Sequence, residues 1–225
     1  MTNEDEDERL NAVVYAELRR RLVTGKMSPG HGLSTRSLAT ELGVSQTPVR
    51  DALSRLAAEG AVEIRSKRRI LVPPMTRERF DDLFRCRLLL EPEAAALAMP
   101  HIDAARLARL IEIDAALDQA IASGDADAYM QCNPAFHFTL YRAPDRRNLT
   151  QLIEMLWLQF GPFMRLVYGR LGTATLIDQH HLALDAIKAK DEAALRAAIT
   201  ADISDGMDLI RRTGLSAPED GATLA

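Results

Sequence analysis

Two side chains near the middle of the chain have the spacing of a metal-chelating pair. Asn133 and His137 lie four residues apart in an apolar segment, and on a helix residues with this spacing project from one face. An amide oxygen and an imidazole nitrogen placed in this way can bind one divalent ion. The alternative is that His137 is a hydrogen-bonded histidine of the core, and the two residues taken alone favour that interpretation.

A second group of side chains has the chemistry of a DNA-binding surface. In residues 45–58 an apolar stripe recurs at helical spacing, and the opposite face is polar and cationic at its N-terminal end. That face carries Gln46, Thr47, Arg50 and Ser54. The loop Ser66-Lys67-Arg68-Arg69 then separates two β-prone runs, which predicts a hairpin with three cations at its tip. When a hairpin of this kind follows a helix-turn-helix along the chain, its cationic tip indicates contact with a phosphate backbone or a minor groove of DNA.

The segments that hold these residues predict a winged helix-turn-helix. An amphipathic helix is expected at residues 10–22, where apolar residues recur at three and four residue steps. Ser34 or Thr35 is expected to cap a helix that ends at Gly43, and Ser45 is expected to cap the helix that carries the polar face. The two-stranded hairpin completes the fold.

The pair Pro73-Pro74 indicates a boundary, because two prolines cannot continue a strand ladder. Beyond it the pattern is helical, and no alternating strand pattern is present. Helices are expected at residues 77–99, with a kink or break at Pro92, and at 103–122, 126–142, 147–169, 174–190 and 192–212. The chain is therefore expected to be mainly α, with a small β-hairpin wing and an all-helical C-terminal bundle.

Charge is distributed unevenly along the chain. The formal net charge is −4, but residues 9–75 carry 12 Lys and Arg against 5 Asp and Glu, whereas residues 76–225 carry 16 against 22. The basic part is therefore expected to meet a polyanion. No apolar run approaches the roughly 18 residues of a membrane span, and the acidic N-terminus is unlike a secretory signal. We expect a cytoplasmic protein with no membrane partner.

The run from Leu33 to Gly60, LSTRSLATELGVSQTPVRDALSRLAAEG, resembles the signature of the GntR family of bacterial transcription regulators. Its T-P-V-R-x-A-L core is specific to that family, and the likeness covers residues 10–74. The resemblance implies that operator DNA is contacted from the two helices of the helix-turn-helix and from the wing. The residues expected there are Arg36, Ser45, Gln46, Thr47, Arg50, Lys67, Arg68 and Arg69.

Two residues of this DNA reader depart from the family pattern. Gln46 stands where arginine is common, and Arg69 stands where a wing glycine is usual. Because glutamine can bind adenine bidentately whereas arginine favours guanine, a shifted operator preference is expected.

The helical part resembles the FCD domain of the FadR subgroup over residues 77–212. The likeness rests on Arg87-Leu-Leu-Leu-Glu91, Asn133-Pro-Ala-Phe-His137-Phe-Thr-Leu, and His180 followed by Ala186-Ile-Lys-Ala-Lys-Asp191. It implies a metal site of Asn133, His137, His180 and Asp202, where Asp202 replaces a histidine of the subgroup. This mixed site suits Zn, Ni or Mn, and the carboxylate lowers the preference for soft metals. Without the resemblance, His180 and its neighbour His181 could simply lie at a wet surface.

Arg87 has two interpretations. Its place one helical turn before Glu91 predicts a salt bridge between the two side chains. The resemblance implies instead that Arg87 is an effector-binding residue, a bidentate clamp for a carboxylate inside the bundle. A buried arginine needs an anion, so burial would favour the clamp.

Together these patterns predict a ligand-responsive transcription regulator and not an enzyme. It is expected to bind double-stranded operator DNA as a homodimer, to respond to a small carboxylate metabolite, and to act as a repressor, the commoner role in the family. The expected parts are a disordered acidic tail (1–9), a winged helix-turn-helix (10–74), a helical effector-binding and dimerisation domain (75–213) and a disordered tail (214–225). The alternatives are a metal-dependent enzyme with an appended DNA-binding module, and a pure protein-interaction module.

Overall fold

The chain forms two compact units of different architecture. The computed structural model describes residues 3–66, 69–171 and 179–212. One unit consists of Met1–Pro74 with Trp157–Phe163, and the other of Met75–Leu156 with Met164–Ala225. The predicted fold class is confirmed, because the first unit holds a helix-turn-helix with a small antiparallel sheet and the second is helical. The predicted wing residues Lys67 and Arg68 and the predicted tail 214–225 lie outside the described residues.

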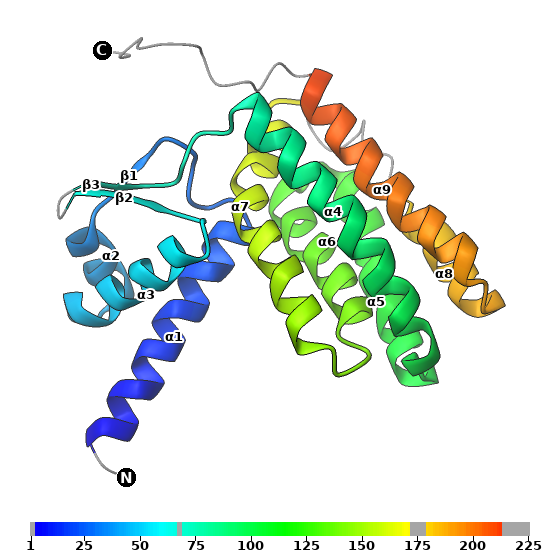
Figure 1. Cartoon of the computed structure of the whole chain (residues 1–225), viewed down its shortest axis with the longest axis horizontal. Coiled ribbons are helices and arrows are strands. Elements are labelled where there is room, and N and C mark those ends of the chain that lie inside the picture. Colours follow the sequence, from blue (N-terminus) through cyan, green and yellow to red (C-terminus); the bar gives the residue numbers. More distant parts are fainter. Residues whose placement is uncertain (1–2, 67–68, 172–178, 213–225) are drawn as a thin grey trace. The chain divides into compact units, whose positions relative to one another are not determined.

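The first unit is a winged helix-turn-helix (Figure 1). Its elements are α1 (Asn3–Val23), β1 (Gly32–Leu33), α2 (Thr35–Leu42), α3 (Gln46–Ala58), β2 (Glu63–Ser66) and β3 (Arg69–Leu71). Helix α3 packs against α1 and α2. Ser34 accepts a hydrogen bond from the Ser37 backbone N–H and so caps α2, and Gly43 ends that helix with a φ of 66°. Ser45 precedes α3, but its side chain makes no capping hydrogen bond, contrary to our expectation.

The sheet of this unit contains a strand that the sequence did not predict. Among the described residues the strand order is β1-β3-β2, with antiparallel neighbours. Gly32 pairs with Leu71 and Leu33 with Ile70, so the expected two-stranded ribbon is extended by β1. A strand of two residues is too short to produce an alternating pattern, so it cannot be predicted from the sequence. Its effect is to pair the second edge of β3.

The first helix begins earlier than expected. Residues 3–9, predicted to be a disordered acidic tail, belong to α1. Acidic side chains in the first turns of a helix interact favourably with the helix dipole, and glutamate is a good helix former. The structure thus has these residues in a helix, and residues 6–10 are exposed as those of a tail would be.

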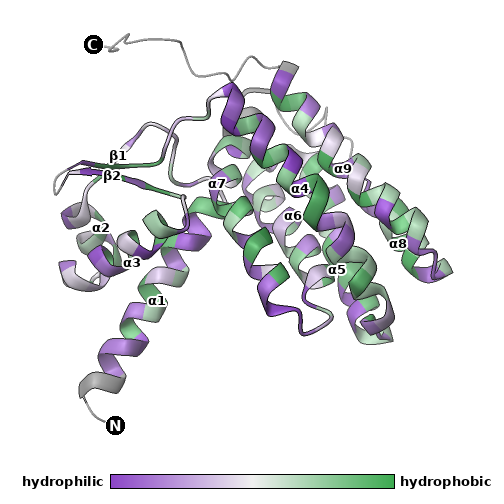
Figure 2. Cartoon of the chain, in the orientation of Figure 1, coloured by the Kyte–Doolittle hydropathy of each residue, from purple (hydrophilic) through white to green (hydrophobic). Residues whose placement is uncertain are grey.

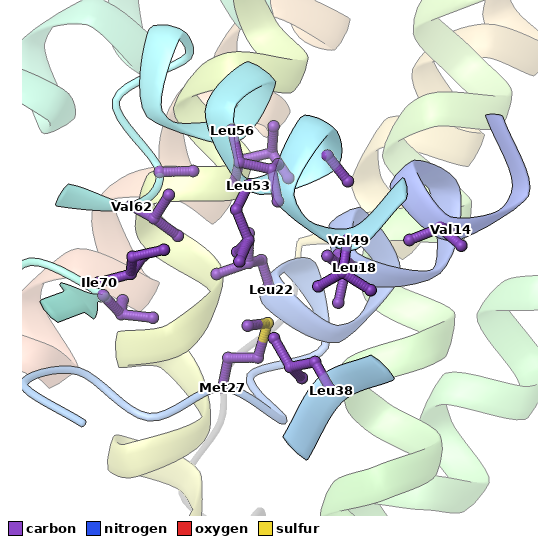
Figure 3. Packing of buried hydrophobic residues seen from close by; sticks show 14 of the residues in the cluster. Val14, Leu18, Leu22, Met27, Leu38, Val49, Leu53, Leu56, Val62 and Ile70 are labelled. Atoms are coloured by element: carbon purple, nitrogen blue, oxygen red, sulfur yellow. The ribbon is translucent and has the colours of Figure 1, made fainter. Parts of the chain in front are cut away.

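The core of the first unit gathers apolar side chains from all its helices (Figure 3). Leu18 and Leu22 of α1 and Leu53 and Leu56 of α3 are fully buried, and Ile70 of β3 joins them from the sheet. These leucines recur at three and four residue steps, so α1 and α3 meet along matching stripes. The polar face of α3 is thereby directed away from the core.

The second unit consists of helices. They are α4 (Arg77–Ala98), a 3-10 turn η1 (Met99–His101), α5 (Ala104–Ser123), α6 (Ala126–Tyr141), α7 (Arg147–Leu171), α8 (His180–Ala189) and α9 (Glu192–Arg212). The segment Trp157–Phe163 of α7 belongs to the first unit. Each starts or ends within a few residues of its predicted limits, except that part of the predicted helix 174–190 falls outside the described residues. Pro92 lies inside α4 but does not end it. The buried ring of Pro92 contributes packing, and loss of one backbone hydrogen bond is tolerated there.

Five of the described helices of this unit form a closed ring. Helix α4 packs against α9, α9 against α8, α8 against α5, α5 against α6, and α6 against α4. Hydrophobic and hydrophilic residues both occur along these helices (Figure 2), as expected of amphipathic helices that bury one side. Within the described part of the chain, no helix is both long enough and apolar enough to cross a membrane.

Candidate functional site

Every helix of the ring contributes polar side chains to one cluster, which we call the central cluster. Its members are Arg87 and Glu91 (α4), Asp114 (α5), Asn133, His137 and Tyr141 (α6), His180 (α8) and Asp202 (α9). Most of these side chains are buried, and the exposed fractions of His137 and Glu91 are both 0%. Buried polar groups cost stability unless they are paired, so a cluster of this size in a helical core indicates a function.

Three members of the central cluster converge as a set of metal ligands. His137 Nε2 lies 3.2 Å from Asp202 Oδ2 and 3.3 Å from His180 Nε2, and His180 Nε2 lies 3.8 Å from Asp202 Oδ1. Atoms bound about 2.1 Å from one ion lie about 3.0 Å apart at octahedral angles and about 3.4 Å apart at tetrahedral angles. The three residues therefore fit a divalent ion.

The protonation of these ligands also suits a metal ion. Burial lowers the pKa of His137, against the opposing effect of Asp202, and so favours the neutral imidazole that binds metals. Burial of Asp202 opposes its ionisation, but His180 and His137 outweigh burial and hold its pKa well below the ordinary range. The site thus presents a carboxylate and a neutral imidazole side by side.

The second ring nitrogen of His137, Nδ1, is the first atom in a chain of hydrogen bonds between buried polar groups. His137 Nδ1 lies 2.9 Å from Tyr141 Oη, and the Tyr141 hydroxyl donates to Glu91 Oε2 at 3.0 Å. Glu91 in turn accepts from Arg87 Nε at 2.5 Å and from Arg87 Nη2 at 3.3 Å. Burial, reinforced by Glu91, raises the pKa of Tyr141 well above its usual value, so this hydroxyl keeps its proton.

The other two candidate ligands, His180 and Asp202, also contact neighbouring groups. The ring of His180 stacks on Phe136, with centroids 4.0 Å apart and an interplanar angle of 14°. Asp114 Oδ1, a buried atom without a hydrogen bond to the described residues, lies 3.6 Å from His180 Nδ1. Asp202 Oδ1 accepts a hydrogen bond from the Gln179 backbone N–H at 3.3 Å. Such outer contacts fix the orientation of ligands before an ion binds.

The structure brings together most of the site residues predicted in the helical part. His137, His180 and Asp202 meet, and Asn133 is buried on α6 one turn before His137. The salt bridge between Arg87 and Glu91 is present, and both side chains are buried. A direct contact between Arg87 and an effector stays a prediction.

Two members of the central cluster were not predicted. Tyr141 lies four residues after His137 and therefore on the same face of α6, which is a signal that the sequence offered. Asp114 interrupts the apolar stripe of Leu110, Ile113 and Leu117 on α5, and an acid inside such a stripe is a second signal.

Those predicted DNA-binding residues that the structure describes lie on the surface of the first unit. Gln46 and Arg50 of α3 and Arg69 of β3 line one groove of about 470 Å³, so the recognition helix and the wing share a surface. Arg36, Ser45 and Thr47 are exposed on the same helix-turn-helix. An exposed polar helix beside a cationic wing is the arrangement with which winged helices enter a DNA groove.

The fold and the two sites define a DNA-binding protein with a helical sensor domain. The model of the family "Bacterial regulatory proteins, gntR family" matches residues 10–72, and that of the FCD domain matches residues 82–205. The chain belongs to the gntR family of bacterial regulatory proteins and carries an FCD domain. It is therefore a ligand-responsive transcription regulator, and the alternative of a metal-dependent enzyme is not supported.

Similar proteins agree with this assignment. The HTH-type transcriptional regulator McbR of Escherichia coli K12 is 35% identical over 83% of this chain and 86% of its own length. The gluconate operon transcriptional repressor of Bacillus subtilis 168 is 29% identical over 90% of this chain and 86% of its own length. The solved structure of E. coli McbR superposes with a TM-score of 0.86 over 91% of this chain and 98% of that chain, at 32% identity.

Proposed function

We propose that this regulator is a homodimeric repressor whose hold on a palindromic operator changes when a small carboxylate binds beside a divalent metal ion in the FCD domain. The observation that carries the proposal is the convergence of His137, His180 and Asp202 at the spacing of ligands around one ion. Its place of action is the cytoplasm, where the operator DNA is.

The donor atoms suit a divalent ion of intermediate hardness. His137 and His180 offer imidazole nitrogens, Asp202 offers a carboxylate oxygen, and Asn133 would offer an amide oxygen. Zn, Ni or Mn are the ions that such a mixed set accommodates. When bound, the ion supplies a positive charge that can hold an effector carboxylate.

Regulation then follows from linkage. An effector can change the affinity for DNA only by binding the DNA-competent and the incompetent arrangements unequally. A coupling free energy of about 1–3 kcal/mol corresponds to an affinity change of roughly 5-fold to 150-fold, which is enough for a switch.

Replacing His137 by alanine is expected to remove the metal ion, because it deletes a nitrogen that two other ligands face. The measurement is elemental analysis of protein loaded with Zn, Ni or Mn and then desalted. His181→Ala is the matched control, since His181 is the exposed neighbour of His180 and should keep the ion. Native protein that retains none of the three metals would contradict the proposed site.

The effector is tested by a thermal-shift screen of organic acids with and without metal. Sugar acids come first, because one relative is a gluconate operon repressor, followed by keto acids, amino acids and fatty acyl compounds. A carboxylate that binds at the ion is expected to raise the melting temperature only of metal-loaded protein. An acid that stabilises the His137→Ala variant equally would place the effector elsewhere.

Replacing Arg50 by alanine is expected to weaken operator binding by about 1–3 kcal/mol, because its exposed guanidinium lies on the reading face of α3. The measurement is a gel shift or fluorescence anisotropy titration at fixed salt. Arg109→Ala, which removes an exposed arginine of α5, is the control and should leave the affinity unchanged. Unchanged binding by Arg50→Ala would remove Arg50 from the DNA interface.

A further inference from the structure

We infer that Arg87, Glu91 and Tyr141, which we call the relay, are positioning residues that hold His137 with its proton on Nδ1 and its Nε2 lone pair directed at the metal. The inference rests on the proposed metal site and adds residues that act through His137 without touching the ion. It also gives Arg87 a role that is independent of any contact with an effector.

The direction of each hydrogen bond in the relay follows from the chemistry of its groups. The Glu91 carboxylate is paired with the Arg87 guanidinium and has no proton to donate, so it can only accept. The single proton of the Tyr141 hydroxyl therefore points to Glu91 Oε2, 3.0 Å away. The Tyr141 oxygen is then an acceptor toward His137 Nδ1 at 2.9 Å, which places the imidazole proton on Nδ1.

The same reasoning applies to the second imidazole. The Asp114 carboxylate lies 3.6 Å from His180 Nδ1, beyond hydrogen-bond distance, but its negative charge favours a proton on that nitrogen. Both Nε2 lone pairs then face each other across 3.3 Å, with Asp202 Oδ2 at 3.2 Å from His137 Nε2. Three electron pairs without a hydrogen between them repel one another, and a cation in their midst removes the repulsion.

The role of Arg87 in the relay is to keep Glu91 an acceptor. Its guanidinium binds both carboxylate oxygens inside a core where the exposed fractions are 4% for Arg87 and 0% for Glu91. Without that charge, a buried carboxyl group would tend to take a proton and could then donate to Tyr141. The hydroxyl of Tyr141 would then be free to donate to His137 Nδ1. The imidazole proton would lie on Nε2, and this nitrogen would have no lone pair for the metal.

The test is Tyr141→Phe, which removes only the hydroxyl. The measurement is a competition between the protein and a chromophoric chelator for Ni²⁺ or Zn²⁺, each ion used alone. We expect the dissociation constant of the variant for the ion to be about 10-fold to 100-fold higher than that of the native protein. Tyr129→Phe is the matched control, because it removes the hydroxyl of another buried tyrosine of α6, three turns before Tyr141, and should leave metal affinity unchanged. Equal metal affinity of native protein and Tyr141→Phe would overturn the relay.

Nitrogen-15 NMR of the histidine rings supplies a readout that a general loss of packing would not mimic. In metal-free native protein, His137 is expected to show its proton on Nδ1, and in Tyr141→Phe to lose that preference. A proton on Nε2 in the native protein would overturn the inference whatever the affinities are.

The second imidazole gives an independent arm. Asp114→Ala is expected to weaken metal binding, and Asp114→Asn is expected to restore part of it, because an amide oxygen in that place still presents partial negative charge to His180 Nδ1. If the native protein bound neither Ni²⁺ nor Zn²⁺, both the proposed function and this inference would be wrong. If the native protein bound the metal ion and none of these variants changed its affinity, only the inference would be wrong.

Discussion

Replacing Glu91 by glutamine is expected to lower the free energy of unfolding by about 3–5 kcal/mol, the usual cost of removing one partner from a buried ion pair. The variant keeps the size of the side chain but removes the charge that balances Arg87. Both side chains lie in the core of the helical ring, with 5% and 0% of their side-chain surface exposed. The measurement is urea unfolding followed by helical circular dichroism.

Two further variants make this expectation specific. Glu93→Gln is the matched control, because Glu93 lies on the same helix and pairs with Arg196 at 2.6 Å, but on the surface. An exposed pair contributes about 0–1 kcal/mol, so this control should be nearly silent. The double variant Arg87→Met with Glu91→Gln is expected to recover most of the loss, since neither member of the pair then carries a charge. A loss in Glu93→Gln as large as that in Glu91→Gln would show that burial of the pair is not the cause.

The fold of the DNA-binding unit could largely be predicted from the sequence. The stripe of Leu53 and Leu56, the cap at Ser34 and the helix end at Gly43 are local signals, and they specify the two helices of the helix-turn-helix. The strand Gly32–Leu33 could not be predicted, because it exists only through its pairing with β3. Tertiary pairing of this kind leaves no periodic pattern in two residues.

The proposed metal site could be predicted only in part from the sequence. The spacing of Asn133 and His137 predicts a shared helix face, but His180 and Asp202 lie on other helices, and only the family resemblance joined them to the pair. Convergence of ligands from three helices is a property of packing, which periodicity cannot specify.

The relay shows a different limit of sequence reasoning. The four-residue step from Arg87 to Glu91 predicts a salt bridge, but it does not say that the pair is buried or that Tyr141 reaches it from the neighbouring helix α6. Burial decides the energetic meaning of the pair. The same spacing on the surface, as between Arg196 and Glu192, stabilises a helix only slightly.

Replacing Leu53 by alanine is the second substitution with a large expected effect, a loss of about 2–5 kcal/mol in the free energy of unfolding. Leu53 is 0% exposed and belongs to the core that joins α1, α3 and the sheet. Truncation removes apolar surface and leaves a cavity that the surrounding side chains fill only in part. Urea unfolding measures the loss, and Val13→Ala is the control, because Val13 of α1 is 65% exposed and should change stability by no more than about 0.5 kcal/mol.

Leu53 and Arg50 lie three residues apart on α3 but serve the two faces of that helix. Leu53→Ala should lower stability, and it should weaken operator binding only where unfolding of the first unit is measurable. Arg50→Ala should weaken operator binding at unchanged stability, because its side chain is exposed and lines the groove beside Arg69. If Arg50→Ala lowered stability as much as Leu53→Ala, the division of α3 into a packing face and a reading face would be wrong.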